Sequence, residues 1–471
     1  MTFDLIVIGS GPAGMRAAIQ AAKAGKRVAI IESFPLLGGG CVHYGTLPSK
    51  SFRESVYRYA LSSRGMLGKE IEGSEDKGGA KTLPDIMRLW KRKERVIEGE
   101  AEVVKDKLTR NKVKIFKGKA TFLSPHELEV TDEDSATRVF KGEKIFIAVG
   151  ANPVPPKTIK VDGKYVLDSN SVLDLSVLPK TMAVLGAGII GCEYGSMFML
   201  AGTKVHLVDK RNEILASVDR EIVSHLTNFF EDHGLEIILE ADTESVKIVG
   251  DQVEVKLTNG RTLTVDRVLV AMGRRGNTEG LDLDKAGLTA DDRGLLKVNA
   301  HYQTSVDHIY AVGDVIGAPA LASTSMEQGR IASAHAFGIV DQQTMPTNFP
   351  YGIYTIPEIS MIGETEESLT TAGRDFVVGR ALYKEVARGQ IVGDQWGMLK
   401  LIVCRNTLKL LGIHIIGDNA AEIIHIGQSV MHFGGDVNYF IHNVFNYPTL
   451  AEAYKTAAFN AIKNLGQAEE E

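Results

Sequence analysis

The chain has 471 residues, of which 44% are hydrophobic and 24% are charged, and its formal net charge is -6. The length predicts about three domains with sizeable cores, and the composition is that of a globular protein. The negative charge argues against a nucleic-acid-binding protein, and three cysteines are too few for a disulfide framework.

The first predicted strand begins within about three residues of the N-terminus, which leaves no room for a signal peptide. The most apolar long stretch, Met182–Gly202, contains Glu193 and several glycines, so it reads as a buried α/β unit and not as a membrane span. We therefore expect a cytoplasmic protein with no membrane partner.

Two stretches of the pattern G-x-G-x-x-G organise the chain, and each follows an apolar run and opens a helix-like segment. The first glycine makes the tight turn from strand to helix, the second lets a pyrophosphate approach the backbone, and the third lets helix and strand pack closely. The helix N-terminus then presents free N–H groups to the phosphates. The glycines are Gly9, Gly11 and Gly14 in the first stretch and Gly186, Gly188 and Gly191 in the second.

An acidic residue ends the next predicted strand after each turn: Glu32 after the first and Asp209 after the second. Each carboxylate could bind the hydroxyl pair of a ribose. One glycine turn is weak evidence, because ordinary α/β sheets contain such turns, but two with the same flanking pattern predict two dinucleotide sites. Two such sites indicate an enzyme that passes electrons from one nucleotide to another.

A further glycine-rich stretch, Gly38–Lys50, follows the first unit and allows its backbone to approach a ligand closely. Pro48 lies where a helix could start and continue through 52–60. The next predicted elements are an exposed loop at 61–82, a long amphipathic helix at 83–110, short strands of a β meander at 113–150, and a break at 151–153 that forms the first domain boundary.

The second unit runs from about 154 to 272, after which an apolar strand ends at Gly313-Asp314. The carboxylate of Asp314 could accept a ribityl or ribose hydroxyl of a flavin, or it could simply cap a turn. Beyond residue 347 the pattern changes to antiparallel strands around helices, which suits a dimerisation domain. The predicted strands there include 381–393, and the predicted helices are 420–433 and 449–465.

Taken together, these motifs resemble the flavoprotein disulfide reductase family, which includes lipoamide dehydrogenase and glutathione reductase, over essentially the whole chain. The resemblance implies an α/β fold with two Rossmann-like domains, one for FAD and one for NAD(P), and a C-terminal α+β domain that forms a homodimer or a higher homo-oligomer. The implied domains are 1–153 and 273–346 for FAD, 154–272 for NAD(P), and 347–471 for dimerisation.

The chain departs from that family at its redox disulfide. The family motif C-x-x-x-x-C-x-P-x-K corresponds to Cys41–Lys50, in which Thr46 replaces the second cysteine. The family's C-terminal histidine, which acts as a base, is Tyr447 here. Both parts of the dithiol machinery are missing, so disulfide reduction of the dihydrolipoamide dehydrogenase kind is excluded unless a cysteine outside the motif substitutes.

One branch of the family, the soluble Si-specific pyridine nucleotide transhydrogenases, is similar to the chain in these departures. The similarity includes the lone cysteine, the Thr46 position, Tyr447 and stretches such as GAGIIGCEYGS and NYPTLAEAY. This branch implies FAD-dependent hydride transfer between NADPH and NAD⁺, with NAD(H) and NADP(H) using one site in turn. The alternatives are an NAD(P)H:quinone or dye reductase, an oxidase, or a non-catalytic nucleotide-binding flavoprotein.

The resemblance pairs Lys50 with Glu193 beside the flavin, where the cation would stabilise the reduced ring. Lys50 could instead be a solvated helix residue, but Glu193 needs a partner inside its apolar run. Gly40 and Cys41 would lie against the flavin, Cys41 more as a packing residue than as a redox group. The histidines form no metal signature, so we expect no metal.

Nucleotide choice is only partly readable from the sequence. Asp209 favours NAD, because an acid there accepts the 2′-hydroxyl and repels a 2′-phosphate. Lys210 and Arg211 follow directly and could pair with a 2′-phosphate, or they could form a solvated charge cluster; the two alternatives are even. Arg274 is a further candidate near the nicotinamide.

Overall fold

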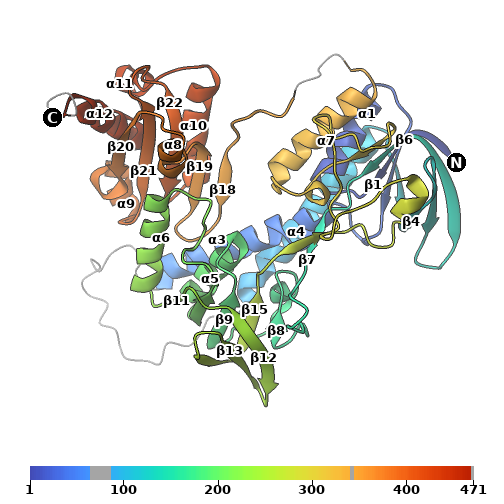
Figure 1. The fold of residues 1–471 in the computed structure, drawn as a ribbon, viewed down its shortest axis with the longest axis horizontal. Coiled ribbons are helices and arrows are strands. Elements are labelled where there is room, and N and C mark those ends of the chain that lie inside the picture. Colours follow the sequence, from blue (N-terminus) through green and yellow to red (C-terminus); the bar gives the residue numbers. More distant parts are fainter. Residues whose placement is uncertain (64–85, 340–343, 468–471) are drawn as a thin grey trace.

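The computed structural model describes residues 1–63, 86–339 and 344–467. The predicted loop at 61–82 lies almost wholly outside these ranges, and its first residues belong to a helix. Figure 1 shows three sheet-centred units: the N-terminal unit at the right, the C-terminal unit at the left, and the second unit below and between them. Within the described ranges, none of the helices has the length and apolar character that a membrane crossing requires.

The N-terminal sheet has the order β3-β2-β1-β6-β5-β4, and its neighbours β3, β2, β1 and β6 run parallel. The long strand β6 pairs with β5 along its first half and with β17 along its second half, so the chain returns to this sheet after the second unit. The strands are β1 (Thr2–Ile8), β2 (Val28–Glu32), β3 (Lys114–Lys117), β4 (Lys119–Ser124), β5 (Glu127–Thr131), β6 (Thr137–Ile147) and β17 (Ile309–Ala311).

The β meander predicted at 113–150 is correct only for β4, β5 and β6. The strand β3 instead extends the parallel sheet beside β2, because the long helix α4 carries the chain back across the sheet before β3 begins. The helices of this unit, of which α1 and α7 pack side by side (Figure 1), are α1 (Pro12–Lys23), α2 (Gly39–His43), α3 (Thr46–Ser63), α4 (Ile86–Arg110), η3 (Asp314–Ile316) and α7 (Ala322–Ala336).

The second unit is a parallel sheet of order β11-β10-β9-β15-β8 with a small antiparallel sheet, β12-β13-β14, beside it. Its central helix α5 is buried throughout from Gly191 to Ala201, which explains its apolar sequence. The unit contains β8 (Val166–Leu167), η1 (Ser171–Asp174), β9 (Thr181–Leu185), α5 (Ile189–Ala201), β10 (Lys204–Val208), α6 (Arg220–Asp232), β11 (Glu236–Ile238), β12 (Thr243–Val249), β13 (Gln252–Leu257), β14 (Thr262–Val265) and β15 (Arg267–Val270).

Two short antiparallel strands, β7 (Ala151–Pro153) and β16 (Arg274–Gly276), pair where the chain enters and leaves the second unit. Their pairing holds the two segments that connect the first and second units side by side. The helical turn η2 (Leu283–Ala286) follows on the way back to the first sheet.

The C-terminal sheet is antiparallel, in the order β18-β19-β22-β21-β20, and α12 packs on β20 and β21. The strand predicted at 381–393 is wrong beyond Leu382, because the chain there forms η4 and α9. Gly389 permits this compact turn, since a side chain at its position would overlap the Tyr383 carbonyl. The elements are β18 (Tyr351–Ile353), β19 (Ile359–Gly363), α8 (Glu366–Thr371), β20 (Phe376–Leu382), η4 (Tyr383–Glu385), α9 (Ala387–Val392), β21 (Met398–Cys404), β22 (Leu410–Ile416), α10 (Ala420–His432), α11 (Asn438–His442) and α12 (Glu452–Gln467).

A buried ionic network joins the second unit to the C-terminal sheet. Lys400 of β21 is 1% exposed, and its Nζ lies 2.8 Å from Asp219 Oδ1 and 3.0 Å from Glu221 Oε2. It also pairs with Glu366 of α8. Burial opposes the charge of Lys400, but the hydrogen bonds that it donates to these carboxylates outweigh burial and raise its pKa.

We predict that Lys400→Met lowers the free energy of unfolding by about 3–5 kcal/mol, because Asp219 would stay buried without its cation. Methionine keeps most of the side-chain volume, so the effect reports charge and not a cavity. Urea unfolding measures it. The matched control is Lys256→Met, since the exposed pair of Lys256 with Glu244 contributes less than about 1 kcal/mol. Equal losses in the two variants would contradict the prediction.

Candidate active site

The first glycine turn joins β1 to α1 through close backbone packing. Gly9 has a φ of +104°, and a side chain at Gly14 would overlap the Gly9 carbonyl oxygen. Pro12 stands at the start of α1, and no side chain of the described residues caps this helix. The first-turn N–H groups are therefore available to an anion.

Glu32 stabilises this turn through hydrogen bonds. Its Oε2 accepts hydrogen bonds from the Ser10 amide at 2.9 Å and the Ser10 hydroxyl at 2.6 Å, and its Oε1 accepts one from the Phe34 amide at 2.8 Å. A carboxylate offers about four acceptor positions, so one position is left for a ribose hydroxyl. The ribose-binding role of Glu32 stays a prediction.

The second glycine turn repeats the geometry of the first between β9 and α5. Gly186 has a φ of +106°, and a side chain at Gly191 would overlap the Gly186 carbonyl oxygen. A Cβ built on Gly188 meets no atom of the described residues within 4 Å, so open space lies above the uncapped N-terminus of α5. This combination of space and free N–H groups fits a pyrophosphate.

Asp209 directly follows β10 next to this turn, and the Arg211 guanidinium covers its carboxylate. The Arg211 Nε and Nη2 atoms lie 3.0 Å from Asp209 Oδ1 and 2.8 Å from Asp209 Oδ2. The Ala187 amide also donates to Asp209 Oδ2, at 2.7 Å. Burial alone would raise the pKa of Asp209, but the Arg211 and backbone hydrogen bonds dominate and lower it, so Asp209 is a carboxylate at neutral pH.

Lys50 of α3 and Glu193 of α5 form an ion pair between the first and second units. Lys50 Nζ lies 2.7 Å from Glu193 Oε2, and the two side chains are 25% and 6% exposed. The other oxygen of Glu193 accepts the Tyr354 amide at 2.8 Å, and the Tyr354 ring lies 4.9 Å below the Lys50 ammonium. The predicted contact between Lys50 and Glu193 is present, and its catalytic role stays a prediction.

Cys41 lies on α2, and Thr46 begins α3, so the two stand at the positions of the family's redox pair. All three cysteines of the chain are described and unbonded. Burial raises the pKa of the Cys41 thiol, and a hydrogen bond with Thr46 offsets only part of that rise. Cys41 is therefore a protonated thiol at neutral pH, as a packing residue would be.

Gly313 and Asp314 follow β17 at the edge of the first unit. Gly313 has a φ of +83°, and its amide donates to the buried Gln328 Oε1 at 2.7 Å. Arg274 lies against them, because its Nη2 lies 3.4 Å from Asp314 Oδ2 and donates to the Ala151 carbonyl. The structure thus places Arg274 beside the predicted flavin-binding aspartate, and its contact with a nicotinamide stays a prediction.

Three residues that hydrogen-bond to predicted site residues were not predicted from the sequence: Ser10, Gln328 and Tyr354. Ser10 and Tyr354 act partly through backbone amides, which carry no side-chain signal. Gln328 did leave a signal, because it is a large amide in a helix of mostly small residues that is buried on the Gly313 side. Gly40, which was predicted to lie near the flavin, accepts the Tyr44 and Gly45 amides at the end of α2.

The first unit has the donors and acceptors that FAD requires. The uncapped α1 suits the pyrophosphate, Glu32 keeps one free acceptor position, and the Asp314 carboxylate remains partly exposed. Among the described residues, no group of three or more histidine, cysteine or acidic side chains is arranged to hold a metal ion.

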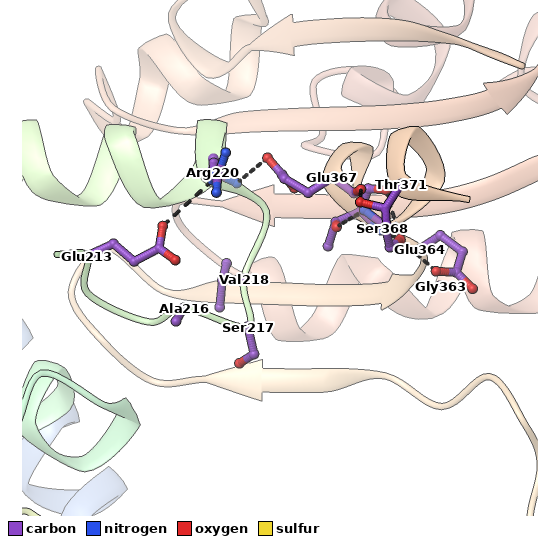
Figure 2. Close-up of a pocket in the computed structure, with 11 residues that line it drawn as sticks. Glu213, Ala216, Ser217, Val218, Arg220, Gly363, Glu364, Glu367, Ser368 and Thr371 are labelled. Carbon is purple, nitrogen blue, oxygen red and sulfur yellow. Dashed lines mark hydrogen bonds and ion pairs between the residues drawn. The ribbon is translucent and has the colours of Figure 1, made fainter. Parts of the chain in front are cut away.

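Two cavities flank these elements. One, of about 410 Å³, contains Lys50, Tyr57 and Tyr354 and lies between α3 and the C-terminal unit. The larger, of about 560 Å³, lies between the loop before α6 and α8 (Figure 2). No residue of either glycine turn lines the larger one, so its size does not mark it as the reaction site.

Comparison with known proteins gives a consistent result over the whole chain. Residues 3–329 match the family model described as pyridine nucleotide-disulphide oxidoreductase, and residues 349–458 match its dimerisation domain. The chain is 45% identical over 464 residues to a soluble pyridine nucleotide transhydrogenase of Mycobacterium bovis, and 43% identical over 468 residues to one of Sodalis glossinidius, with 98% of each chain covered.

Solved structures are similar as well. The Cu(II) complex of the HOCl-induced flavoprotein disulfide reductase RclA from Escherichia coli has a TM-score of 0.88 at 28% identity and covers 98% of this chain and 99% of its own. LpdA from Mycobacterium tuberculosis has a TM-score of 0.87 at 26% identity and covers 97% and 99%.

We predict that Cys41 is alkylated by iodoacetamide more slowly than Cys404 at pH 7.5. The thiolate is the reacting form; burial raises the pKa of Cys41, whereas hydrogen bonds from Thr407 lower the pKa of Cys404. The rate at Cys41 should rise only at higher pH. Peptide mapping by mass spectrometry measures both rates. Thr46→Val should slow the alkylation of Cys41 further. Equal alkylation rates at the two cysteines in the parent protein would refute the assignment of Cys41 as a protonated thiol.

Proposed function

The chain belongs to the pyridine nucleotide-disulphide oxidoreductase family, and we propose from this that it transfers hydride from NADPH to NAD⁺ through a bound FAD. The supporting observation is one contrast at the active site. The Lys50–Glu193 ion pair is kept, while Thr46 stands where the reductases have their second cysteine.

This contrast distinguishes disulfide reduction from hydride transfer between nicotinamides. A dithiol reductase needs a second sulfur next to Cys41 and a base that works with the thiol. Thr46 cannot form a disulfide, and Tyr447 stands in place of the histidine. A hydride transfer between nicotinamides needs neither group, so the loss of both is compatible with activity.

FAD supplies the redox chemistry, because its ring takes up a hydride from one nicotinamide and releases it to another. The chain binds and orients it. The N-terminus of α1 holds the pyrophosphate, and Glu32 and Asp314 accept hydroxyl hydrogen bonds from the sugar parts. Lys50 places a positive charge at the ring, and Glu193 holds that charge in position.

A single nicotinamide site serves both nucleotides in this proposal. Only one glycine turn, Gly186–Gly191, remains once the first is assigned to FAD. NADPH therefore binds, reacts and leaves before NAD⁺ enters the same place, which is a ping-pong order.

The active enzyme is a cytoplasmic homodimer in this proposal. The C-terminal unit exposes apolar side chains that a single chain leaves uncovered, among them Val444 at 93% and Tyr447 at 74% exposure. The match of residues 349–458 to a dimerisation domain supports a second copy as their cover. The three unbonded cysteines suit a reducing compartment.

Anaerobic stopped-flow absorbance tests the function. We expect NADPH to bleach the flavin band and NAD⁺, added after removal of excess NADPH, to restore it while NADH appears. Flavin that stays reduced until a quinone or oxygen is added would instead make the protein an acceptor reductase. Purified protein without flavin would support a non-catalytic nucleotide-binding protein.

We predict that Lys50→Met slows flavin reduction by NADPH at least about 10-fold, because the developing negative charge on the ring loses its cation. Glu193→Gln should have a smaller effect, since Lys50 keeps its charge but loses its anchor. Lys256→Met, which removes an exposed cation of β13 that pairs with Glu244, is the matched control. An unchanged rate in Lys50→Met would remove the lysine from the mechanism.

We predict that Val444→Asp shifts the protein from dimer to monomer, because burying a carboxylate without a partner is costly. Size-exclusion chromatography with light scattering measures the mass. Val249→Asp places the same charge on an exposed valine of the second unit and should leave the dimer intact. A Val444→Asp variant that remains dimeric would move the interface elsewhere.

A further inference from the structure

The Asp209–Arg211 pair has a geometry that bears on nucleotide choice. The Arg211 guanidinium meets the carboxylate side-on, with Nε on one oxygen and Nη2 on the other. A guanidinium has five N–H donors, of which this contact uses two. The Arg211 side chain is 44% exposed, so its outer donors reach solvent, whereas Asp209 is only 6% exposed.

The backbone beneath this pair is fixed. The Arg211 amide donates to Asp209 Oδ1 at 2.9 Å, and the Arg211 carbonyl accepts the Glu240 amide at 3.0 Å. Further along the same loop, the Leu215 amide donates to the Ala187 carbonyl at 3.0 Å. These hydrogen bonds tie the loop backbone to its surroundings, while the exposed Arg211 side chain has room to move into solvent.

The far end of the loop is held by the C-terminal unit. Figure 2 shows Arg220, where α6 begins, between Glu213 of the loop and Glu367 of α8. Asp219, one residue earlier, is buried and bound to Lys400. The loop between Asp209 and α6 is therefore held by hydrogen bonds or ion pairs at both of its ends.

We propose that the Asp209–Arg211 pair lets one site accept both NAD(H) and NADP(H), with Arg211 as a movable charge that covers or uncovers Asp209. This inference rests on the proposed function only in that hydride transfer between NADPH and NAD⁺ requires one site to take both nucleotides. The effect of the pair on nucleotide binding is independent of hydride transfer. With NADP(H), Arg211 stays on Asp209 and donates from its outer edge to the 2′-phosphate. With NAD(H), Arg211 swings outward and Asp209 accepts the 2′-hydroxyl.

Electrostatics explains why both residues are needed. An uncovered Asp209 would repel a 2′-phosphate at short range, as in sites that select NAD. The bidentate arginine cancels that charge without removing the acceptor. Lys210, its exposed neighbour, has no such contact with Asp209 among the described residues and would act only as a diffuse charge.

The test measures binding of adenosine 2′,5′-bisphosphate and 5′-AMP to the FAD-loaded protein by isothermal titration calorimetry. Arg211→Ala should raise the Kd of the bisphosphate roughly 10- to 100-fold and that of 5′-AMP less than about 3-fold. Asp209→Asn, which keeps an acceptor for the Ala187 amide, should weaken 5′-AMP but not the bisphosphate. When Arg211→Ala is added to the Asp209→Asn variant, it should raise the Kd of the bisphosphate by a smaller factor, because no uncovered carboxylate remains.

The matched control is Arg261→Ala, since Arg261 has a similarly exposed side chain and also pairs with an acidic residue, Glu236, in the same unit. It should change neither Kd. Equal weakening of both ligands in Arg211→Ala would mean a structural role and overturn the proposal, as would a larger bisphosphate loss in Lys210→Ala than in Arg211→Ala. A protein that shows the expected split but no NADPH-to-NAD⁺ transfer would refute the proposed function and leave this inference standing.

Discussion

The Glu193 carboxylate is the constraint on which the arrangement of the three units depends. It sits on α5, a helix buried on all sides, so it must be paired. One oxygen binds Lys50 from the first unit and the other binds the Tyr354 amide from the start of the C-terminal unit. A single acidic side chain thus ties the flavin-side helix, the nucleotide-side helix and the C-terminal sheet to one point.

This geometry also explains which features of the structure could be predicted from the sequence. Glycine turns were predictable because their cause is local: Gly14 and Gly191 have no room for a Cβ beside the carbonyl five residues earlier. The need of Glu193 for a partner was predictable from burial alone. The partner's identity came from resemblance, since nothing in residues 182–202 refers to a lysine more than 130 residues away.

The failures have the same physical origin. The residues of α9 were predicted as part of a strand. Ile391 and Val392 do favour strands locally, but tight packing of Gly389 on η4 decides the outcome. The partner of Lys400 lies 181 residues away in another unit, so no local pattern could reveal that this lysine is buried. Arg274 shows the limit most clearly, because it was predicted as a candidate near the nicotinamide but its contact with Asp314 was not predicted.

A carboxylate that binds a cation has different consequences at Asp219 and at Asp209. Lys400 and Asp219 are both inaccessible, so their pair is locked and serves to place α6 and the loop before it. Asp209 is 6% exposed, but its partner Arg211 is 44% exposed and can move into solvent, and in the proposal a ribose hydroxyl then takes its place at the carboxylate. A loop held at both ends, with a releasable cation at its start, is the arrangement expected where a site must stay in place while the charge of its ligand changes.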